Sequence, residues 1–384
     1  MIHKSFTVLL SSLFSLLIIS GCSSDRNNNA AVETMVEKTP DVQSMSGSAD
    51  HNSDSSSSEK SSDNSSEHSK SADMTAAAVV LEDPYYNSSK EYGSLWKSDL
   101  FDSSRFTMKI DLNDAERKEA RILARSFESH MGRGKVFMHY LLSELKARNL
   151  PAELAAVPLV ESGFKNRARS HANAHGPWQF TRRTGKSFGL SVNDKYDEFY
   201  DFVASTRASL TYLEHLYRQL GNNWDLALVA YNQGEFGVKK LIRRARANGV
   251  KNITAETIKL TKGGRTYLKR FKAYAAILQN PEKFGVEHPA VDNRVAFRRV
   301  QVAGRVASMT EAARMSGVDI KVLKHLNAGY LTDSLISSKN HGLLVPSENA
   351  WQFEKAIGHK VFISSPGYEL TSVNVDHAKG SNVN

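Results

Sequence analysis

A serine-rich segment limits where this chain of 384 residues can build a folded core. Residues 51–73 are nearly half Ser and contain no Leu, Ile, Val, Phe, Tyr or Trp. Such a composition buries too little apolar surface to offset the chain entropy that is lost on folding. We therefore expect residues 23–78 to form a disordered tether, whose r.m.s. span is roughly 40 Å for a flexible coil of that length.

The N-terminus has the features of a targeting sequence. Lys4 precedes about 15 mostly apolar residues, 5–19, which would rise only ~22 Å as a helix, less than a bilayer requires. This length is typical of a signal peptide. The following Ser20-Gly21-Cys22 resembles a bacterial lipobox, which implies cleavage before Cys22 and lipidation of its thiol. The alternative is a plain signal sequence with a chance or buried cysteine.

Charge and cysteine content narrow the possible partners. The chain has 50 Lys and Arg against 41 Asp and Glu, a net charge of +9 that favours anionic partners such as acidic polymers, membrane surfaces or nucleic acid. Cys22 is the only cysteine, which excludes a disulfide framework and a multi-cysteine metal site within the chain.

The rest of the sequence predicts a mainly α fold. Apolar residues recur at i, i+3, i+4 within residues 137–145, 210–220, 226–231 and 271–278. No alternating run is long enough to predict a large sheet. A helical bundle without chemistry is the simplest interpretation of this pattern alone.

Three motifs point beyond that interpretation. They are PLVESGF at residues 158–164, SHANAHGPWQF at 170–180 and AYNQG at 230–234. Together they resemble the soluble-lytic-transglycosylase family, whose lysozyme-like domain cleaves peptidoglycan. Each motif alone is weak, but all three occur in the family's order and spacing. The resemblance covers roughly residues 95–290 and is closest to the membrane-bound lytic transglycosylase D group.

The resemblance implies a role for each matching residue. The catalytic Glu is Glu161, and Ser170, Gln179 and Tyr231 follow it by 9, 18 and 70 positions, as in the family. Glu161 would act as the acid and then as the base. Ser170 and Gln179 would hold substrate groups, and Tyr231 would support the charge near Glu161. Two further implied site residues are Asn232, which would order the pocket or pack with a buried hydrogen bond, and Tyr267, which would contact substrate.

The residues around Glu161 agree with a catalytic acid. Cleavage of a glycosidic bond requires a group that protonates the leaving oxygen, and a Glu does so near neutral pH only if its pKa is raised. Apolar neighbours such as Val160 and Phe164 would raise it. Pro158 disfavours helix at Val157, so we expect a backbone bend there. The competing interpretation is a surface carboxylate at a helix end.

The implied mechanism needs no second carboxylate. In the family, the C6 hydroxyl of the N-acetylmuramyl residue attacks its own anomeric carbon and gives a 1,6-anhydro product, so proximity replaces an enzyme nucleophile. If the reaction were instead hydrolytic, Asp194, Asp197 and Glu198 would be candidate partners. Otherwise these three form a charged loop surface.

Two departures from the family pattern concern the site. Pro177 stands between Gly176 and Trp178, where it would stiffen the loop of residues 170–180, called the substrate loop below. The family's Glu-Thr-x-x-Tyr appears here as Gly263-Gly264-Arg265-Thr266-Tyr267, so the Tyr is kept and the acidic residue is absent.

His171 and His175 are four residues apart, but no Glu separates them as in a helical zinc motif. We predict no metal site and no cofactor.

The C-terminal part is similar to the LysM carbohydrate-binding module, a strand, two helices and a strand. Residues 308–326 predict two short helices and residues 342–346 a strand, although Gly304-Arg305-Val306 replaces the usual Gly-Asp-Thr. The predicted division of the chain is a signal peptide with lipobox at 1–22, a tether at 23–78, a helical extension at 79–138, a catalytic domain at 139–290, a LysM-like module at 297–348 and a tail at 349–384, which begins helical.

Ser23, and not an Asp, follows the cysteine, which resembles a lipoprotein sorted to the outer membrane. Together these resemblances imply an outer-membrane lipoprotein that faces the periplasm and cleaves the glycan strands of peptidoglycan. The alternatives are a muramidase that uses water and a non-catalytic wall-binding protein. A nucleic-acid binder is disfavoured by the lipobox and by the absence of any nucleic-acid motif.

Overall fold

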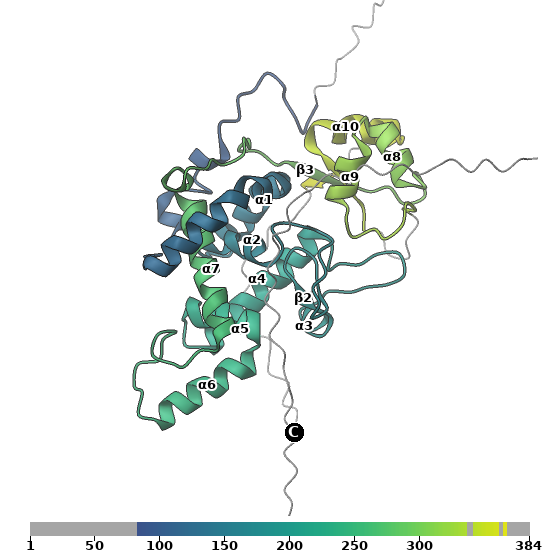
Figure 1. Ribbon diagram of the computed structural model, residues 1–384. Helices are drawn as coiled ribbons and strands as arrows, with labels where there is room; N and C mark the ends of the chain where they lie inside the picture. The colour runs from purple at the N-terminus through teal and green to yellow at the C-terminus, as the bar shows by residue number, and fades with distance from the viewer. Residues whose placement is uncertain (1–82, 336–340, 361–363, 367–384) are drawn as a thin grey trace, which may run out of the picture. The chain divides into compact units, whose positions relative to one another are not determined.

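The computed structural model describes residues 83–335, 341–360 and 364–366 (Figure 1). Within these ranges the fold is mainly helical, as predicted. The predicted signal peptide, lipidated Cys22 and tether lie outside the described residues, as do the last residues of the tail.

The elements follow one another in a helical part and a small mixed part. The helices are α1 Asp114–Ala147, α2 Val157–Glu161, α3 Arg182–Ser187, α4 Phe202–Gln219, α5 Trp224–Gln233, α6 Glu235–Ala247, α7 Lys262–Gln279, α8 Met309–Ser316, α9 Ile320–Leu326 and α10 Ser347–Ala356. The 3-10 helices are η1 Leu95–Lys97, η2 Ser103–Arg105, η3 Ala152–Ala156 and η4 Pro281–Phe284. The strands are β1 Ala174–His175, β2 Phe180–Thr181, β3 Phe297–Val300, β4 Leu343–Pro346 and β5 Ser365–Pro366.

The long helix α1 begins at a reciprocal cap. Asn113 Oδ1 accepts from the backbone N–H of Glu116 at 3.0 Å, and Glu116 Oε2 accepts from the N–H of Asn113 at 2.8 Å. Two of the backbone N–H groups at the start of the helix, which have no partner within it, are thereby satisfied. Further along α1, the predicted apolar stripe of residues 137–145 is buried in the main core, where α7 packs against it.

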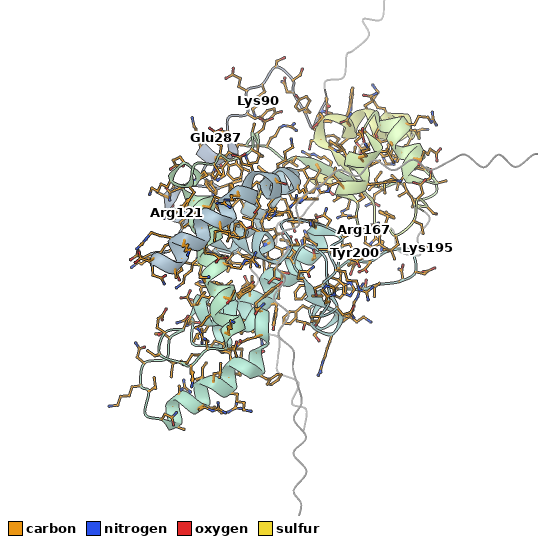
Figure 2. All side chains as sticks on the ribbon, in the orientation of Figure 1. Lys90, Arg121, Arg167, Lys195, Tyr200 and Glu287 are labelled. Atoms are coloured by element: carbon orange, nitrogen blue, oxygen red, sulfur yellow. The ribbon has the colours of Figure 1, made fainter. Side chains whose placement is uncertain are left out.

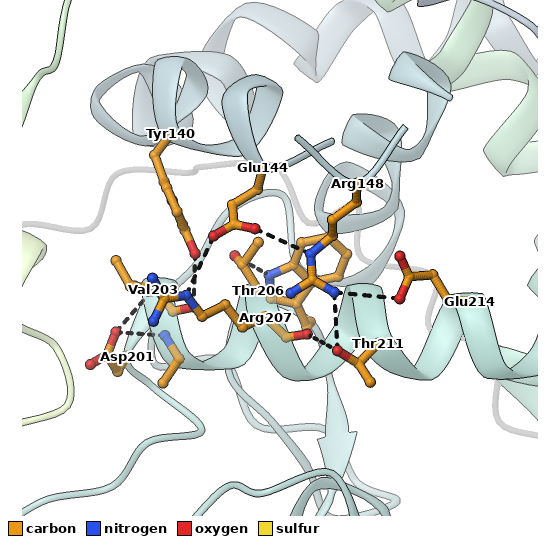
Figure 3. A network of polar contacts seen from close by, with 11 residues as sticks. Tyr140, Glu144, Arg148, Asp201, Val203, Thr206, Arg207, Thr211 and Glu214 are labelled. Atoms are coloured by element: carbon orange, nitrogen blue, oxygen red, sulfur yellow. Dashed lines mark hydrogen bonds and ion pairs between the residues drawn. The ribbon is translucent and has the colours of Figure 1, made fainter. Parts of the chain in front are cut away.

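A buried charge network joins α1 to α4 (Figure 3). Glu144 is fully buried, and its carboxylate accepts from Arg148 Nε at 3.1 Å and from Arg207 Nε at 3.4 Å. Arg148 also donates to Thr211 Oγ1 at 3.1 Å and reaches Glu214 at 3.5 Å. Removing one partner from such a network leaves an uncompensated buried charge. The position of α4 against α1 is therefore fixed by charge as well as by packing.

The C-terminal part contains the two predicted helices, α8 and α9, and the predicted strand β4, so these predictions are confirmed. β3 lies between β4 and β5 in an antiparallel sheet of three strands. The helix expected after residue 349 begins at Ser347, and this helix, α10, packs against β3 and α8.

The loop that follows α2 is hydrogen-bonded to the C-terminal part, and Figure 2 labels one of its residues, Arg167. Asn166 Nδ2 donates to the carbonyl of His325 at 2.8 Å. Arg167 donates through Nε to the carbonyl of Ala328 at 3.1 Å and through its guanidinium to that of Tyr330. These hydrogen bonds join the segment that carries Glu161 to the C-terminal part.

None of the helices in the described ranges has the length and apolar content needed to cross a membrane.

Candidate active site

Glu161 is the last residue of α2, a short helix that continues from η3. The prediction of a backbone bend at Val157 is wrong, because this residue has helical backbone angles of φ −60° and ψ −50°. Pro158 is tolerated because it lies in the first turn of α2, where its missing N–H has no partner to lose. The 3-10 helix and the α-helix meet at this point without a break.

The environment of Glu161 favours its protonated form. Burial in apolar surroundings raises the pKa of Glu161 to about 7, although Tyr267 and the charge of Arg270 act in the opposite direction. Tyr267 Oη donates to Glu161 Oε1 at 2.7 Å. Glu161 nevertheless remains partly exposed, so a ligand can reach it. A half-protonated carboxyl group near neutral pH suits both an acid and a base.

Tyr267 reaches Glu161 because α7 packs against α2, and α7 also lies close to α5. A Cβ at Gly264 would lie 2.8 Å from Gln233 Oε1 and 3.0 Å from Val229 Cγ1, so a larger residue at this position would push the two helices apart. Thr261, the N-cap of α7, also donates to Gln233 Oε1 at 2.6 Å. Gly264 thus has a packing role, whereas a Cβ at Gly263 would meet only Thr261 Oγ1, at an ordinary contact distance of 3.8 Å.

Tyr231 lies in the same electrostatic environment as Glu161. Burial and the Glu161 charge raise the pKa of Tyr231 well above its ordinary value, so its hydroxyl stays protonated and can donate. Tyr231 Oη donates to the carbonyl of Trp178 at 2.8 Å and lies 3.2 Å from Ser209 Oγ. The indole of Trp178 in turn donates to Thr206 Oγ1 at 2.9 Å. Two residues of α4 therefore hold Tyr231 and the substrate loop together.

A hydrogen bond from Ser162 ties the substrate loop to α2. Ser162 Oγ donates to the carbonyl of Pro177 at 2.9 Å. Gly176 makes the loop conformation possible, because its φ is +81° and a Cβ there would lie 1.8 Å from the carbonyl oxygen of Phe199. Neither the strain nor the overlap could be relieved by a side-chain movement.

The other predicted substrate residues have local structural partners. Ser170 Oγ accepts from the N–H of Ala174 at 3.1 Å and closes the turn before β1. Gln179 Nε2 donates to the carbonyl of Gly176 at 2.8 Å, which leaves its amide oxygen for another donor. Asn232 is exposed, so the alternative of a buried hydrogen bond is wrong for this residue. Their roles in substrate binding stay predictions.

The three carboxylates considered for hydrolysis have other surroundings. Asp197 is buried and forms a two-oxygen ion pair with Arg182 at 2.5 and 2.7 Å. Glu198 Oε2 accepts from the N–H and the hydroxyl of Ser191 at 2.6 and 2.8 Å. Asp194 is exposed. Two of the three are therefore used in holding the loop before α4.

The two histidines weighed as metal ligands do not share a helix. His171 is exposed in a turn, whereas His175 lies in β1, with Nδ1 3.1 Å from Tyr200 Oη and Nε2 3.1 Å from Asn173 Oδ1. Across the described ranges, no group of three or more His, Cys, Asp or Glu residues could hold a metal ion.

Comparison with protein families agrees with this arrangement. The model of the transglycosylase SLT domain matches residues 142–254, which include Glu161 and Tyr231. A second model, the LysM-like domain of lytic transglycosylase MltD, matches residues 296–357. The chain belongs to the transglycosylase SLT family. The prediction of a mainly α fold with a small LysM-like module is confirmed.

Several known proteins are similar to this chain. Membrane-bound lytic murein transglycosylase D of Escherichia coli K12 is 33% identical over 268 residues, which are 69% of this chain and 58% of that protein. A putative tributyltin chloride resistance protein of an Alteromonas species is 35% identical over 158 residues, 39% of this chain and 76% of that protein. An inactive mutant of the lytic transglycosylase Slt of Pseudomonas aeruginosa aligns with 25% identity over 40% of this chain and 25% of that chain, with a TM-score of 0.30.

Sequence reasoning missed the residues that position the site. Ser162, Trp178, Thr206 and Ser209 link α2, the substrate loop and Tyr231 through the hydrogen bonds described above. Ser162 and Trp178 lie within the recognised motifs, which is a usable signal. Thr206 and Ser209 lie outside these three motifs, and their role depends on where α4 packs.

Proposed function

We propose that this chain is a peptidoglycan lytic transglycosylase that cleaves the bond between N-acetylmuramic acid and N-acetylglucosamine and leaves 1,6-anhydro ends. The observation that carries the proposal is one carboxyl group, Glu161, with a pKa of about 7 and a hydrogen bond from Tyr267. Membership of the SLT family supports it.

The geometry suggests how one carboxyl group serves both proton transfers. Glu161 Oε1 accepts from Tyr267, so Oε2 is the oxygen that carries the mobile proton. Oε2–H protonates the glycosidic oxygen as the bond to the anomeric carbon breaks. The C6 hydroxyl then forms a bond to that carbon, and its proton passes to Oε2. No water and no second carboxylate takes part.

The surroundings of two of the three carboxylates considered for hydrolysis, Asp197 and Glu198, favour this route. Asp197 is neutralised by Arg182, and Glu198 is occupied by Ser191. Mass spectrometry of products from purified sacculi tests the proposal directly. Anhydro ends support it, whereas reducing ends would make the protein a muramidase. A protein that binds sacculi and releases nothing would be a wall-binding protein.

The location belongs to the same proposal. We infer an outer-membrane lipoprotein facing the periplasm, anchored through Cys22, because the only cysteine ends a lipobox-like sequence. The similar protein from Escherichia coli is named as membrane-bound, which supports an association with a membrane. Peptidoglycan is the expected partner, and no nucleic acid is expected.

A further inference from the structure

A surface pocket of about 490 Å³ lies between the end of α4, one side of α6 and the segment after α6. Its polar lining includes Lys239, Arg243, Arg246 and Lys251 and contains no acidic residue. Gln219 and the apolar residues Leu220, Ile242 and Ile253 complete most of the remaining wall. Four cations around one cavity attract a ligand with more than one negative charge.

Three of these four cationic side chains have no acidic partner among the residues that the structure describes. Lys239 is matched by Glu235 at 2.6 Å and by Gln219 Oε1 at 2.9 Å. Arg243, Arg246 and Lys251 are exposed, and within the described part of the chain none of them forms an ion pair. An anion that enters the pocket would therefore replace water and not an existing carboxylate partner.

A single helix, α4, connects the candidate site to the pocket. Ser209, whose hydroxyl lies 3.2 Å from Tyr231 Oη, and Gln219, which lines the pocket, are both on α4. Ten residues of α-helix rise about 15 Å. Near the start of α6, Phe236 exposes 84% of its surface on the same helical stripe as Arg243, seven residues later. An exposed aromatic ring thus lies on the Arg243 face of α6, about two turns nearer the start of the helix.

We propose that this pocket binds the carboxylates of the peptide stem on the substrate strand. The inference rests on the proposed function. A stem of four or five residues carries free carboxylates and extends about 13–18 Å. That reach matches the distance along α4. The mixed lining of cations and aliphatic side chains suits a short peptide better than a bare phosphate. The enzyme would then prefer strands that carry stems to strands stripped of them.

Binding to sacculi tests this preference. In a Glu161→Gln background, which keeps the sacculi intact, dissociation constants are measured by co-sedimentation with intact sacculi and with sacculi stripped of stems by an amidase. The R243A/R246A pair should lower the preference for intact sacculi by about 3- to 30-fold, the change expected when two partly exposed ion pairs are lost. The R243K/R246K pair should restore most of the preference.

A matched control removes two charges from another side of the same helix. Lys240 and Arg244 are exposed on α6 but do not line the pocket, so K240A/R244A should change the preference less than twofold. An equal loss in both alanine pairs would show a general charge effect and overturn the proposal, as would no loss in R243A/R246A.

A lipid partner is the competing occupant. If R243A/R246A abolished binding to phosphatidylglycerol vesicles and left the preference for intact sacculi unchanged, the pocket would face a membrane and the proposal would be wrong. The proposed function fails separately. Products of the protein with Glu161 intact that lack anhydro ends would overturn that function and leave the binding result standing.

Discussion

Replacing Glu161 with glutamine should change how folding stability depends on pH. The pKa of Glu161 is about 7 in the folded protein, against an ordinary value of 4.5. Between these values the folded state binds the proton and the unfolded state has released it. The contribution of Glu161 to the free energy of unfolding is therefore at its maximum below pH 4.5, and it is lost as the pH rises through about 7.

The size of this effect follows from the two pKa values. A difference of about 2.5 between them corresponds to roughly 3 kcal/mol of unfolding free energy, at ~1.36 kcal/mol per pH unit. Glutamine at position 161 has no proton to release, and its amide oxygen can still accept from Tyr267. The stability of Glu161→Gln relative to the unmodified protein should thus rise by up to about 3 kcal/mol between pH 4 and pH 8.5.

Urea unfolding at several pH values across this range measures the difference. Asp194→Asn is the matched control, because it makes the same chemical change at an exposed position. A stability difference that stays constant with pH would refute the raised pKa and, with it, the role of burial at Glu161. In the same preparation, cleavage of sacculi should fall by at least about 10²-fold.

Three further changes test other parts of the argument. Tyr267→Phe removes a hydrogen bond that lowers the pKa of Glu161, so the alkaline limb of the pH–kcat/KM profile should move to higher pH; an acidic shift would contradict this. Gly176→Ala would overlap the carbonyl of Phe199 and should destabilise the fold by about 1–3 kcal/mol in thermal unfolding, whereas an unchanged Tm would show that the loop can relax. Cys22→Ser should move the protein from the membrane to the soluble fraction of fractionated cells, and retention in the membrane would indicate a plain anchor.

The helices could be predicted because their signal is local. Burial with a period of 3.6 residues appears in residues 137–145, 210–220 and 271–278, and each stretch lies in a helix except for Leu220, which caps the end of α4. The α8–α9 pair and the strand β4 were predictable because their signals also lie within short stretches of the sequence. Propensity failed at Val157, where the tertiary packing of α2 against its neighbours outweighs the usual effect of a following proline.

The sequence was enough to predict which residues belong to the candidate site, but not their hydrogen bonds or backbone angles. Motif spacing selected Glu161, Tyr231 and Tyr267, and burial with Coulomb coupling relates all three. Spacing could not reveal that Ser170 and Gln179 bond to their own loop, because local turn bonds depend on backbone angles. Gln179 has a φ of +49°, which no pattern in the sequence indicates.

The placement of Tyr231 depends on charges that are not themselves in the site. Its hydroxyl is held by Ser209 and by the carbonyl of Trp178, whose indole is held by Thr206. Ser209 and Thr206 are three residues apart, so they share one face of α4. α4 is fixed on α1 by the buried carboxylate of Glu144 (Figure 3). Since Thr206 and Ser209 place the substrate loop and the Tyr231 hydroxyl, we interpret the costly burial of the Glu144 charge as the means of holding α4 in position for both.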